Sequence, residues 1–135
     1  MKKEYFTPRG VHPTNFQSKD PRYSHAVKVG NTIYVSGQAG INERGEIADG
    51  FEAQCIQLFE NMKRVLEAAG ASLEDVVKLT GYFLNYSRDR SKYHEIKARY
   101  FNQPMPACTN MQITQLGLPE VLAEVEAVAV VDDEH

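Results

Sequence analysis

Apolar residues dominate the segment Val121–Val131, and two acids interrupt the run. Side chains of a β-strand point alternately to its two faces, so Glu124 and Glu126 are expected on the same face of a strand. A near-continuous apolar run is typical of a strand covered on both faces, where an ionised carboxylate is costly unless it is paired, hydrogen-bonded or beside a wet cleft. Both acids are therefore candidates for a functional site. The structural alternative is that they meet solvent or cap a neighbouring strand or subunit.

The segment Tyr23–Ser36 has the alternation of a β-hairpin, with Gly30-Asn31 as a two-residue turn. The second strand runs into the glycine-containing stretch 36–40, where the backbone can approach another group closely. Residues 1–22 carry prolines and Gly10 among polar residues, which predicts an irregular arm with one short strand. Residues 42–46 predict a surface turn.

Two segments carry helical spacing. Between Glu52 and Ala69 the apolar residues fall on one stripe, and Gly70 stands where a C-terminal cap belongs. The stripe consists of Cys55, Leu58, Phe59, Met62, Val65, Leu66 and Ala69. The second helix is expected to begin between Ser87 and Ser91 and to end before residues 102–104. Its expected buried side holds Tyr93, Ile96, Tyr100 and Phe101.

Two more strands are predicted around the second helix. Residues 72–75 indicate a capped helical turn, followed by a strand over Val76–Leu84. One face of this strand is expected to hold Val77, Leu79, Gly81 and Phe83. A strand over Ala107–Leu116 precedes the turn at 117–119 and the final strand, after which the acidic tail is expected to fray.

This element order predicts an α+β fold in which a mixed sheet carries both helices on one face. Apolar residues that include Ile33, Val35, Val128 and Val130 indicate that the other face of the sheet is partly apolar too. A small domain with two apolar sheet faces usually buries one of them between subunits, so we expect a homo-oligomer.

Composition narrows the class of protein. The 135 residues, 42% of them apolar, fit one domain spanning 1–135. A net charge of −3 without a run of Lys or Arg disfavours nucleic acid as the main partner. The sequence shows neither a signal peptide nor a membrane-spanning run, so no membrane partner and a cytoplasmic location are expected. Two cysteines do not make a disulfide framework.

Several stretches together match one family pattern. They are Tyr23–Val27 with Gly30-Asn31, Val35–Gln38, Leu66–Lys78, Pro106-Ala107 and Glu124–Ala129. In this order they resemble the Rid family, also called the YjgF, YER057c and UK114 family, over nearly everything from Tyr23 onward. The resemblance implies a chorismate-mutase-like fold assembled as a homotrimer, with clefts for a small-molecule ligand between subunits. This implication agrees with the oligomer expected from the sheet.

The resemblance also implies chemistry. Well-studied members hydrolyse reactive imines and enamines such as 2-aminoacrylate to 2-oxo acids and ammonia, and they need no metal or cofactor. By position, Tyr23 and Ser36 would line the pocket, Gly37 would present its backbone, and Glu124 would position or activate water; Ser36 and Glu124 are the implied catalytic residues. Attack of water on a C=N bond needs a proton taken from water and one delivered to nitrogen, and a carboxylate in a low-dielectric cleft can have its pKa raised toward that task.

The sequence departs from the family pattern at one position. Active deaminases read Pro-Ala-Arg-Ser or Pro-Ala-Arg-Thr, where the arginine grips the substrate carboxylate, whereas this chain reads Pro106-Ala107-Cys108-Thr109. A thiol cannot replace a bidentate guanidinium, so a substrate other than 2-aminoacrylate is expected. Cys108 has three readings: a small buried residue, a nucleophile that would need a His, Lys or helix end nearby, or, with Thr109, part of a substrate-binding wall for a neutral or bulkier ligand.

Other candidate residues give weaker indications of a functional site. His25 is expected to be a half-buried strand residue rather than a base, and no metal-binding pattern joins the scattered His12, His94 and His135. Either Arg22 or Arg99 could replace the missing guanidinium, although solvated surface is the alternative for both.

Three hypotheses about function follow. The first is a Rid-like imine or enamine deaminase, the second a non-catalytic trimer that binds a small ligand in the same clefts, and the third an RNA-directed endoribonuclease. The acidic balance of charge makes the third the least favoured.

Overall fold

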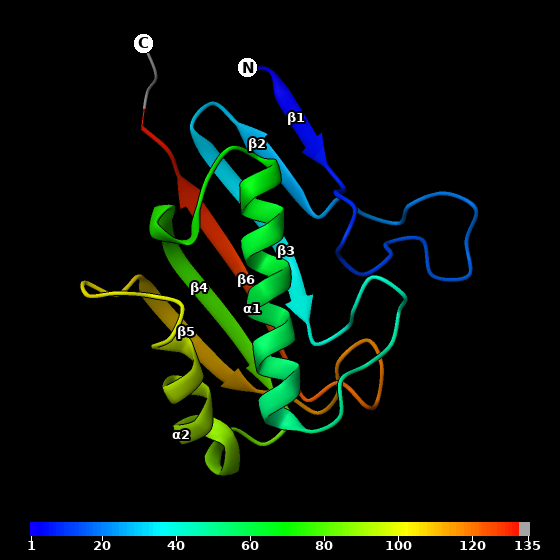
Figure 1. Cartoon of the computed structure of the whole chain (residues 1–135), viewed down its shortest axis with the longest axis vertical. Coiled ribbons are helices and arrows are strands. Elements are labelled where there is room, and N and C mark those ends of the chain that lie inside the picture. Colours follow the sequence, from blue (N-terminus) through cyan, green and yellow to red (C-terminus); the bar gives the residue numbers. More distant parts are fainter. Residues whose placement is uncertain (133–135) are drawn as a thin grey trace.

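Six strands form one mixed sheet, and both α-helices lie on the same side of it (Figure 1). The strands are β1 (Lys3–Phe6), β2 (Ala26–Val29), β3 (Thr32–Ala39), β4 (Val76–Phe83), β5 (Ala107–Gln112) and β6 (Ala123–Val130). Their order across the sheet is β1-β2-β3-β6-β4-β5, with β4 and β5 parallel and the other neighbours antiparallel. This computed structural model describes residues 1–132, so tail residues 133–135, for which fraying is predicted, lie outside the described residues.

The first helix, α1 (Phe51–Ala68), confirms the predicted stripe, because every residue of that stripe is buried. Gly70 adopts a φ of +85° just after the helix, as a C-terminal glycine cap does. The N–H of Ala71 donates to the carbonyl of Leu66 at 2.8 Å and that of Gly70 to Glu67 at 3.1 Å, which satisfies carbonyls at the helix end. The predicted turn follows as a 3-10 helix, Leu73–Asp75, with a capping box.

The second helix, α2 (Tyr86–Lys97), starts one residue before the predicted window, where the Asn85 side chain accepts a hydrogen bond from the N–H of Arg88. Tyr93 and Ile96 are buried as predicted. The helix ends at Lys97, so placing Tyr100 and Phe101 within it was wrong. The chain leaves the helical path there, and Phe101 packs edge-on against Phe59 of α1 with ring centroids 5.7 Å apart.

Alternation along β6 confirms that Glu124 and Glu126 share a face. The intervening residues Ala123, Val125, Ala127 and Ala129 are buried in the core under the helices. Glu124, Glu126, Val128 and Val130 therefore occupy the face that the helices leave uncovered.

Two predictions about sheet faces were wrong. Ile33 and Val35 pair with the buried Ala129 and Ala127, so they face the helices, and Tyr34 between them is 53% exposed on the other face. Val77 is 47% exposed because an irregularity in the β4–β6 register between Val76 and Lys78 puts Val76 in the core in its place. The uncovered face is still partly apolar, through Tyr34, Val128 and Val130.

The last two strands are shorter than predicted. Strand β5 ends at Gln112 because its partner β4 ends at Phe83, and the N–H of Ile113 donates the last hydrogen bond to the Phe83 carbonyl. Strand β6 begins at Ala123, so Val121 belongs to the preceding loop. Residues 113–122 therefore form a loop at one end of the sheet, near the N-terminal arm and the loop after β3 (Figure 1).

Buried polar side chains of α1 hold these loops. Gln54 donates to the carbonyls of Ala48 (3.0 Å) and Glu120 (3.1 Å), and its Oε1 accepts from the N–H of Leu122 at 2.8 Å. Asn61 donates to the carbonyls of Ala39 and Ile41. Backbone groups of two loops and of the end of β3 are thus satisfied by one helix, which fixes the loops relative to the sheet.

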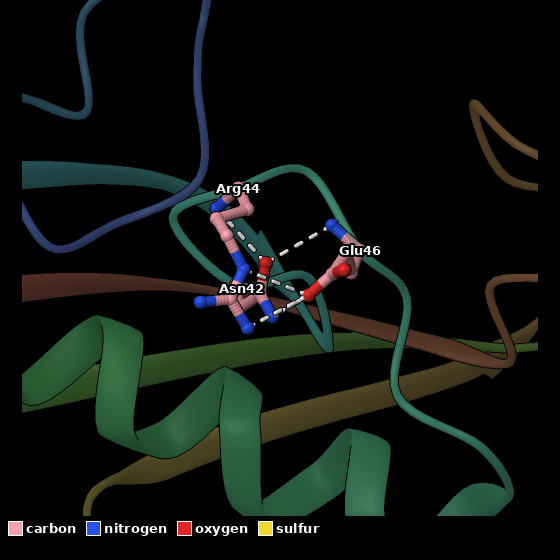
Figure 2. Close-up of polar contacts among 3 residues, drawn as sticks. All are labelled: Asn42, Arg44 and Glu46. Atoms are coloured by element: carbon pink, nitrogen blue, oxygen red, sulfur yellow. Dashed lines mark hydrogen bonds and ion pairs between the residues drawn. The ribbon is translucent and has the colours of Figure 1, made fainter.

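Residues 42–46 form the predicted surface turn (Figure 2). The Asn42 Oδ1 accepts from the N–H groups of Arg44 and Glu46, and Glu46 Oε1 accepts from both Asn42 Nδ2 and the Arg44 guanidinium. The hydrogen bond from Asn42, and then those from Arg44, lower the pKa of Glu46. A bridge between Ile41 and Ile47 closes the base of the turn.

We expect Gln54→Leu to lower the free energy of unfolding by about 3 kcal/mol, because three backbone partners lose their hydrogen bonds at about 1 kcal/mol each. Denaturant unfolding measures this difference. The same substitution at Gln57 on the same helix removes one hydrogen bond, to Asn61, and is expected to cost about 1 kcal/mol. Equal effects of the two substitutions would show that Gln54 does not hold the loops.

Candidate active site

A pocket of about 670 Å³ opens at the end of the sheet where the arm and two loops meet. This volume lies within the range of small-molecule sites, roughly 300–1,000 Å³. Polar lining comes from His12, Gln17, Tyr23, Ser36 and Glu124, and apolar lining from Phe16, Ala39, Ile41, Leu118 and Val121, with Gly37 and Gly117 between them. The structure thus brings together Tyr23, Ser36, Gly37 and Glu124, all predicted from sequence as site residues.

A β-bulge in β3 shapes one wall of the pocket. The register with β6 shifts between Val35 and Gln38, so Ser36 and Gly37 together stand opposite a single residue, Glu126. Gly37 confirms that a glycine allows close approach there, because a methyl group on its Cα would overlap the carboxylate of Glu124. An alanine at this position would displace the glutamate, so the glycine is part of the site's geometry.

Glu124 is a carboxylate in an unfavourable environment. Burial raises its pKa, and the nearby charge of Glu126 raises it further. Glu126 itself accepts a hydrogen bond of 3.0 Å from the Tyr82 hydroxyl, and no described residue donates a hydrogen bond to the Glu124 carboxylate. A poorly compensated carboxylate lining a pocket is suited to exchanging a proton with water or substrate.

Two residues with hydroxyl groups, Tyr23 and Ser36, line the same pocket as this carboxylate. The pKa of Tyr23 is raised by burial and by the charge of Glu124, so its hydroxyl stays protonated. The Ser36 hydroxyl donates to the carbonyl of Ser24 at 2.7 Å, which leaves its oxygen lone pairs, rather than its proton, for a ligand. Ser36 therefore presents a hydrogen-bond acceptor to the pocket. In this arrangement it is not an activated nucleophile.

Two histidines contact the side chain of Tyr23. His12 is buried, and its Nε2 lies 3.0 Å from the Tyr23 hydroxyl. His25 lies just before β2 and is fully buried, so the prediction that it is half-buried was wrong. Its ring contacts those of His12 and Tyr23 edge-on. Sequence reasoning missed His12 as a pocket residue, since it lies on an irregular arm where no periodicity predicts its direction. Leu118 was missed for the same reason, and Val121 because it was predicted within the final strand, which begins only at Ala123.

Cys108 and Thr109 do not line the pocket of their own chain. They lie on β5, separated from β6 by β4. Cys108 pairs with the buried Leu79 and so faces the helices, whereas Thr109, on the opposite face, accepts a hydrogen bond from Lys78. The Nζ of Lys97, a residue only 6% exposed, lies 3.6 Å from the Cys108 sulfur. The fold thus supplies a lysine neighbour that the sequence around Cys108 does not reveal.

Neither candidate arginine lines the pocket. Arg22 donates to the carbonyl of Phe16, a pocket residue, and its own side chain lies on the surface. Arg99 is 3.9 Å from the Glu52 carboxylate on the outside of the helices. No lysine or arginine is among the described residues that line the pocket.

Within residues 1–132, no group of three or more His, Cys, Asp or Glu side chains is arranged to hold a metal ion. The same residues include no helix with the length and apolarity needed to cross a bilayer.

Comparisons with known proteins identify the family of this chain. A RutC family protein from Pyrococcus abyssi is 42% identical over 120 residues, which cover 84% of this chain and 93% of that protein. A protein of Dermatophagoides farinae named 2-iminobutanoate/2-iminopropanoate deaminase is 39% identical, with 82% and 86% covered. The crystal structure of RidA from an Antarctic Psychrobacter superposes with a TM-score of 0.79 at 36% identity, covering 92% of this chain and all of that one. The family model described as Endoribonuclease L-PSP matches residues 17–131, and the chain therefore belongs to the Rid (YjgF/YER057c/UK114) family.

Proposed function

We propose that this protein hydrolyses a small imine or enamine to a carbonyl compound and ammonia. One observation carries the proposal: the Glu124 carboxylate lines a pocket, beside the backbone of Gly37, with its pKa raised by burial and by Glu126. The relative named as an iminobutanoate and iminopropanoate deaminase supports the same reaction class.

The proposed mechanism uses Glu124 as a proton shuttle. The carboxylate removes a proton from water as the water oxygen bonds to the imine carbon, and the electron pair of the C=N bond moves to nitrogen. Glu124 then returns that proton to the nitrogen. In the second half, the hydroxyl group of the adduct loses its proton to Glu124, the C–N bond breaks, and the amine leaves with that proton as ammonia. Ser36 contributes a hydrogen-bond acceptor, and Gly37 leaves the space that the Glu124 carboxylate occupies.

The charge of the pocket supports a substrate without a carboxylate. The described lining residues include Glu124 but no Lys or Arg, and Glu126 adds a second negative charge nearby. A 2-iminocarboxylate would bring a third negative charge to these two, with no guanidinium to hold it. We therefore propose a neutral or cationic imine with an apolar substituent, which would contact Phe16, Ile41 and Leu118.

We further propose that the pocket is completed in a homotrimer. The uncovered face of the sheet exposes Tyr34 and Val130, and β5, an edge strand, carries Cys108 and Thr109. These two residues can join a substrate site only as the wall of a neighbouring subunit's pocket. Sedimentation equilibrium should give the mass of a trimer, and a monomer at micromolar concentration would contradict this arrangement.

A ligand-binding trimer without catalysis is the second candidate. The apolar lining of the pocket and the engagement of the Ser36 proton with Ser24 favour it, since both suit binding more than turnover. It predicts that a neutral imine analogue raises the melting temperature through binding to the native state while no ammonia is released. The RNA-directed alternative is less favoured, because the net charge is −3 and the described lining of the pocket has no cation.

We expect Glu124→Gln to reduce kcat for imine hydrolysis by about 10²- to 10⁴-fold, the contribution typical of a general base. An amine oxidase supplies carboxylate-free imines and an amino-acid oxidase supplies 2-iminocarboxylates, and competition with semicarbazide reports the hydrolysis rate. The same substitution should raise the melting temperature at pH 7. The raised pKa of Glu124 means that its ionised form destabilises the native state above the unfolded value near 4.5, and this gain should vanish as the pH falls below that value.

Glu126→Gln is the matched control, since it is the same change on the same face, outside the pocket lining. It keeps an oxygen for Tyr82 and removes the smaller cause of the raised pKa of Glu124. Activity should persist, with the acid limb of the pH profile moved to lower pH. If Glu124→Gln were instead active, or less stable than wild type at pH 7, Glu124 would be a structural acid.

We expect Cys108→Arg to increase the rate with 2-iminocarboxylates relative to carboxylate-free imines, because it restores a guanidinium for the carboxylate. Lys97 would repel that guanidinium, so the gain should be larger in a Lys97→Met background. The ratio of kcat/KM for the two imine classes measures the effect. An unchanged ratio in both backgrounds would show that residue 108 does not reach the substrate.

A further inference from the structure

The hydrogen bonds behind Tyr23 have assignable directions. His25 Nε2 lies 2.8 Å from the backbone carbonyl of His12, and a carbonyl only accepts, so His25 carries its proton on Nε2. Its Nδ1 is then an acceptor, and the amide nitrogen of Gln38 donates to it at 3.2 Å and to the Ser36 carbonyl at 3.0 Å. If the Gln38 amide were flipped, its oxygen would face His25 Nδ1 and the Ser36 carbonyl, which are both acceptors.

This chain of hydrogen bonds anchors the N-terminal arm at His12. Gln38 and His25 are both fully buried, and Gln38 reaches the helix-facing side of β3 because the bulge at Ser36–Gly37 shifts its register. Burial lowers the pKa of His25, so it stays neutral and keeps its single proton for the His12 carbonyl. The position of His12 is thus set by the sheet, even though His12 lies on an irregular segment.

The side chain of His12 has one ring nitrogen with a partner and one without. Nε2 lies 3.0 Å from the Tyr23 hydroxyl, whereas Nδ1 is buried and has no hydrogen-bond partner among residues 1–132. The imidazole is neutral, because burial and then His25 lower its pKa to about 4. A buried N–H without an acceptor is rarer than an unsatisfied acceptor, so the proton belongs on Nε2, where it donates to Tyr23.

We propose that His12 is a positioning residue that directs the hydroxyl hydrogen of Tyr23 into the pocket. Since the Tyr23 oxygen accepts from His12, its own hydrogen has no acceptor among the described residues outside the pocket it lines. The hydroxyl then donates a hydrogen bond to the substrate nitrogen as that nitrogen gains electron density during water attack. This consequence for catalysis rests on the proposed function, but the direction of the hydroxyl does not.

NMR tests the direction without any assay of activity. Long-range ¹H–¹⁵N correlation separates a protonated from a bare ring nitrogen, and loss of signals in His12→Gln assigns those of His12. We expect protonated Nε2 and bare Nδ1 for both His12 and His25. A proton on Nδ1 of His12 would overturn the proposal, because Tyr23 would then donate to His12 and present no hydrogen to the pocket.

Kinetics test the consequence. His12→Phe and Tyr23→Phe should each lower kcat by about 10- to 100-fold, and the double variant should lose no more than either single one, because both remove the same donor. His12→Gln, whose amide nitrogen can take the place of Nε2, should retain most of the activity. Additive losses, or equal losses in His12→Gln and His12→Phe, would indicate that His12 is only structural.

A second His–Tyr pair supplies the control. His94 Nε2 lies 3.4 Å from the Tyr86 hydroxyl on the surface, away from the pocket, and His94→Phe should leave kcat unchanged. The two proposals fail separately. A wild-type protein that hydrolyses no imine, but shows the expected tautomers, would contradict the proposed function and leave the orientation of Tyr23 in place.

Discussion

Strand β6 lies between β3 and β4, and the alternation of its side chains serves both stability and the site. One set of residues, from Ala123 to Ala129, is buried against the helices, and the other set presents Glu124 and Glu126 on the uncovered face. A shift of one residue in its register would expose the apolar set and bury both carboxylates, which is prohibitively costly. The core therefore holds Glu124 in place, although burial in the pocket disfavours its charge.

The pocket combines the paired strands β3 and β6 with three irregular segments: the N-terminal arm, the loop after β3 and the loop before β6. The bulge in β3 brings Gly37 against Glu124, Gln54 holds the loop that contains Val121, and the pair Gln38 and His25 anchors the arm. The contacts of Gln54 and of the pair Gln38 and His25 are hydrogen bonds from buried polar side chains to backbone or to each other. Such contacts are directional, so they specify one arrangement of the loops where apolar packing alone would allow several.

The pocket of one chain suits proton exchange better than it suits the binding of an anion. The carboxylate and the hydroxyl groups in the pocket remain, so proton exchange with water is still available, while the described pocket lining offers no cation for an anionic substrate. A buried lysine beside Cys108 shows that positive charge is present near this strand, but on its helix-facing side. Under the proposed function, selectivity among imines is the property in which we expect this chain to differ most from the relative named as a deaminase.

Periodicity in the sequence was sufficient to predict the hairpin, the stripe of α1 with its glycine cap, and the common face of Glu124 and Glu126, because these depend on neighbours along the chain. The family motifs added Tyr23, Ser36 and Gly37 to the same pocket. Register shifts decided what periodicity could not: they put Val76 rather than Val77 in the core, and Gln38 behind the pocket. The direction of His12 and the meeting of Lys97 with Cys108 also came only from tertiary structure, since residues distant in sequence, such as His25 and Gln38 for His12, determine where those side chains lie.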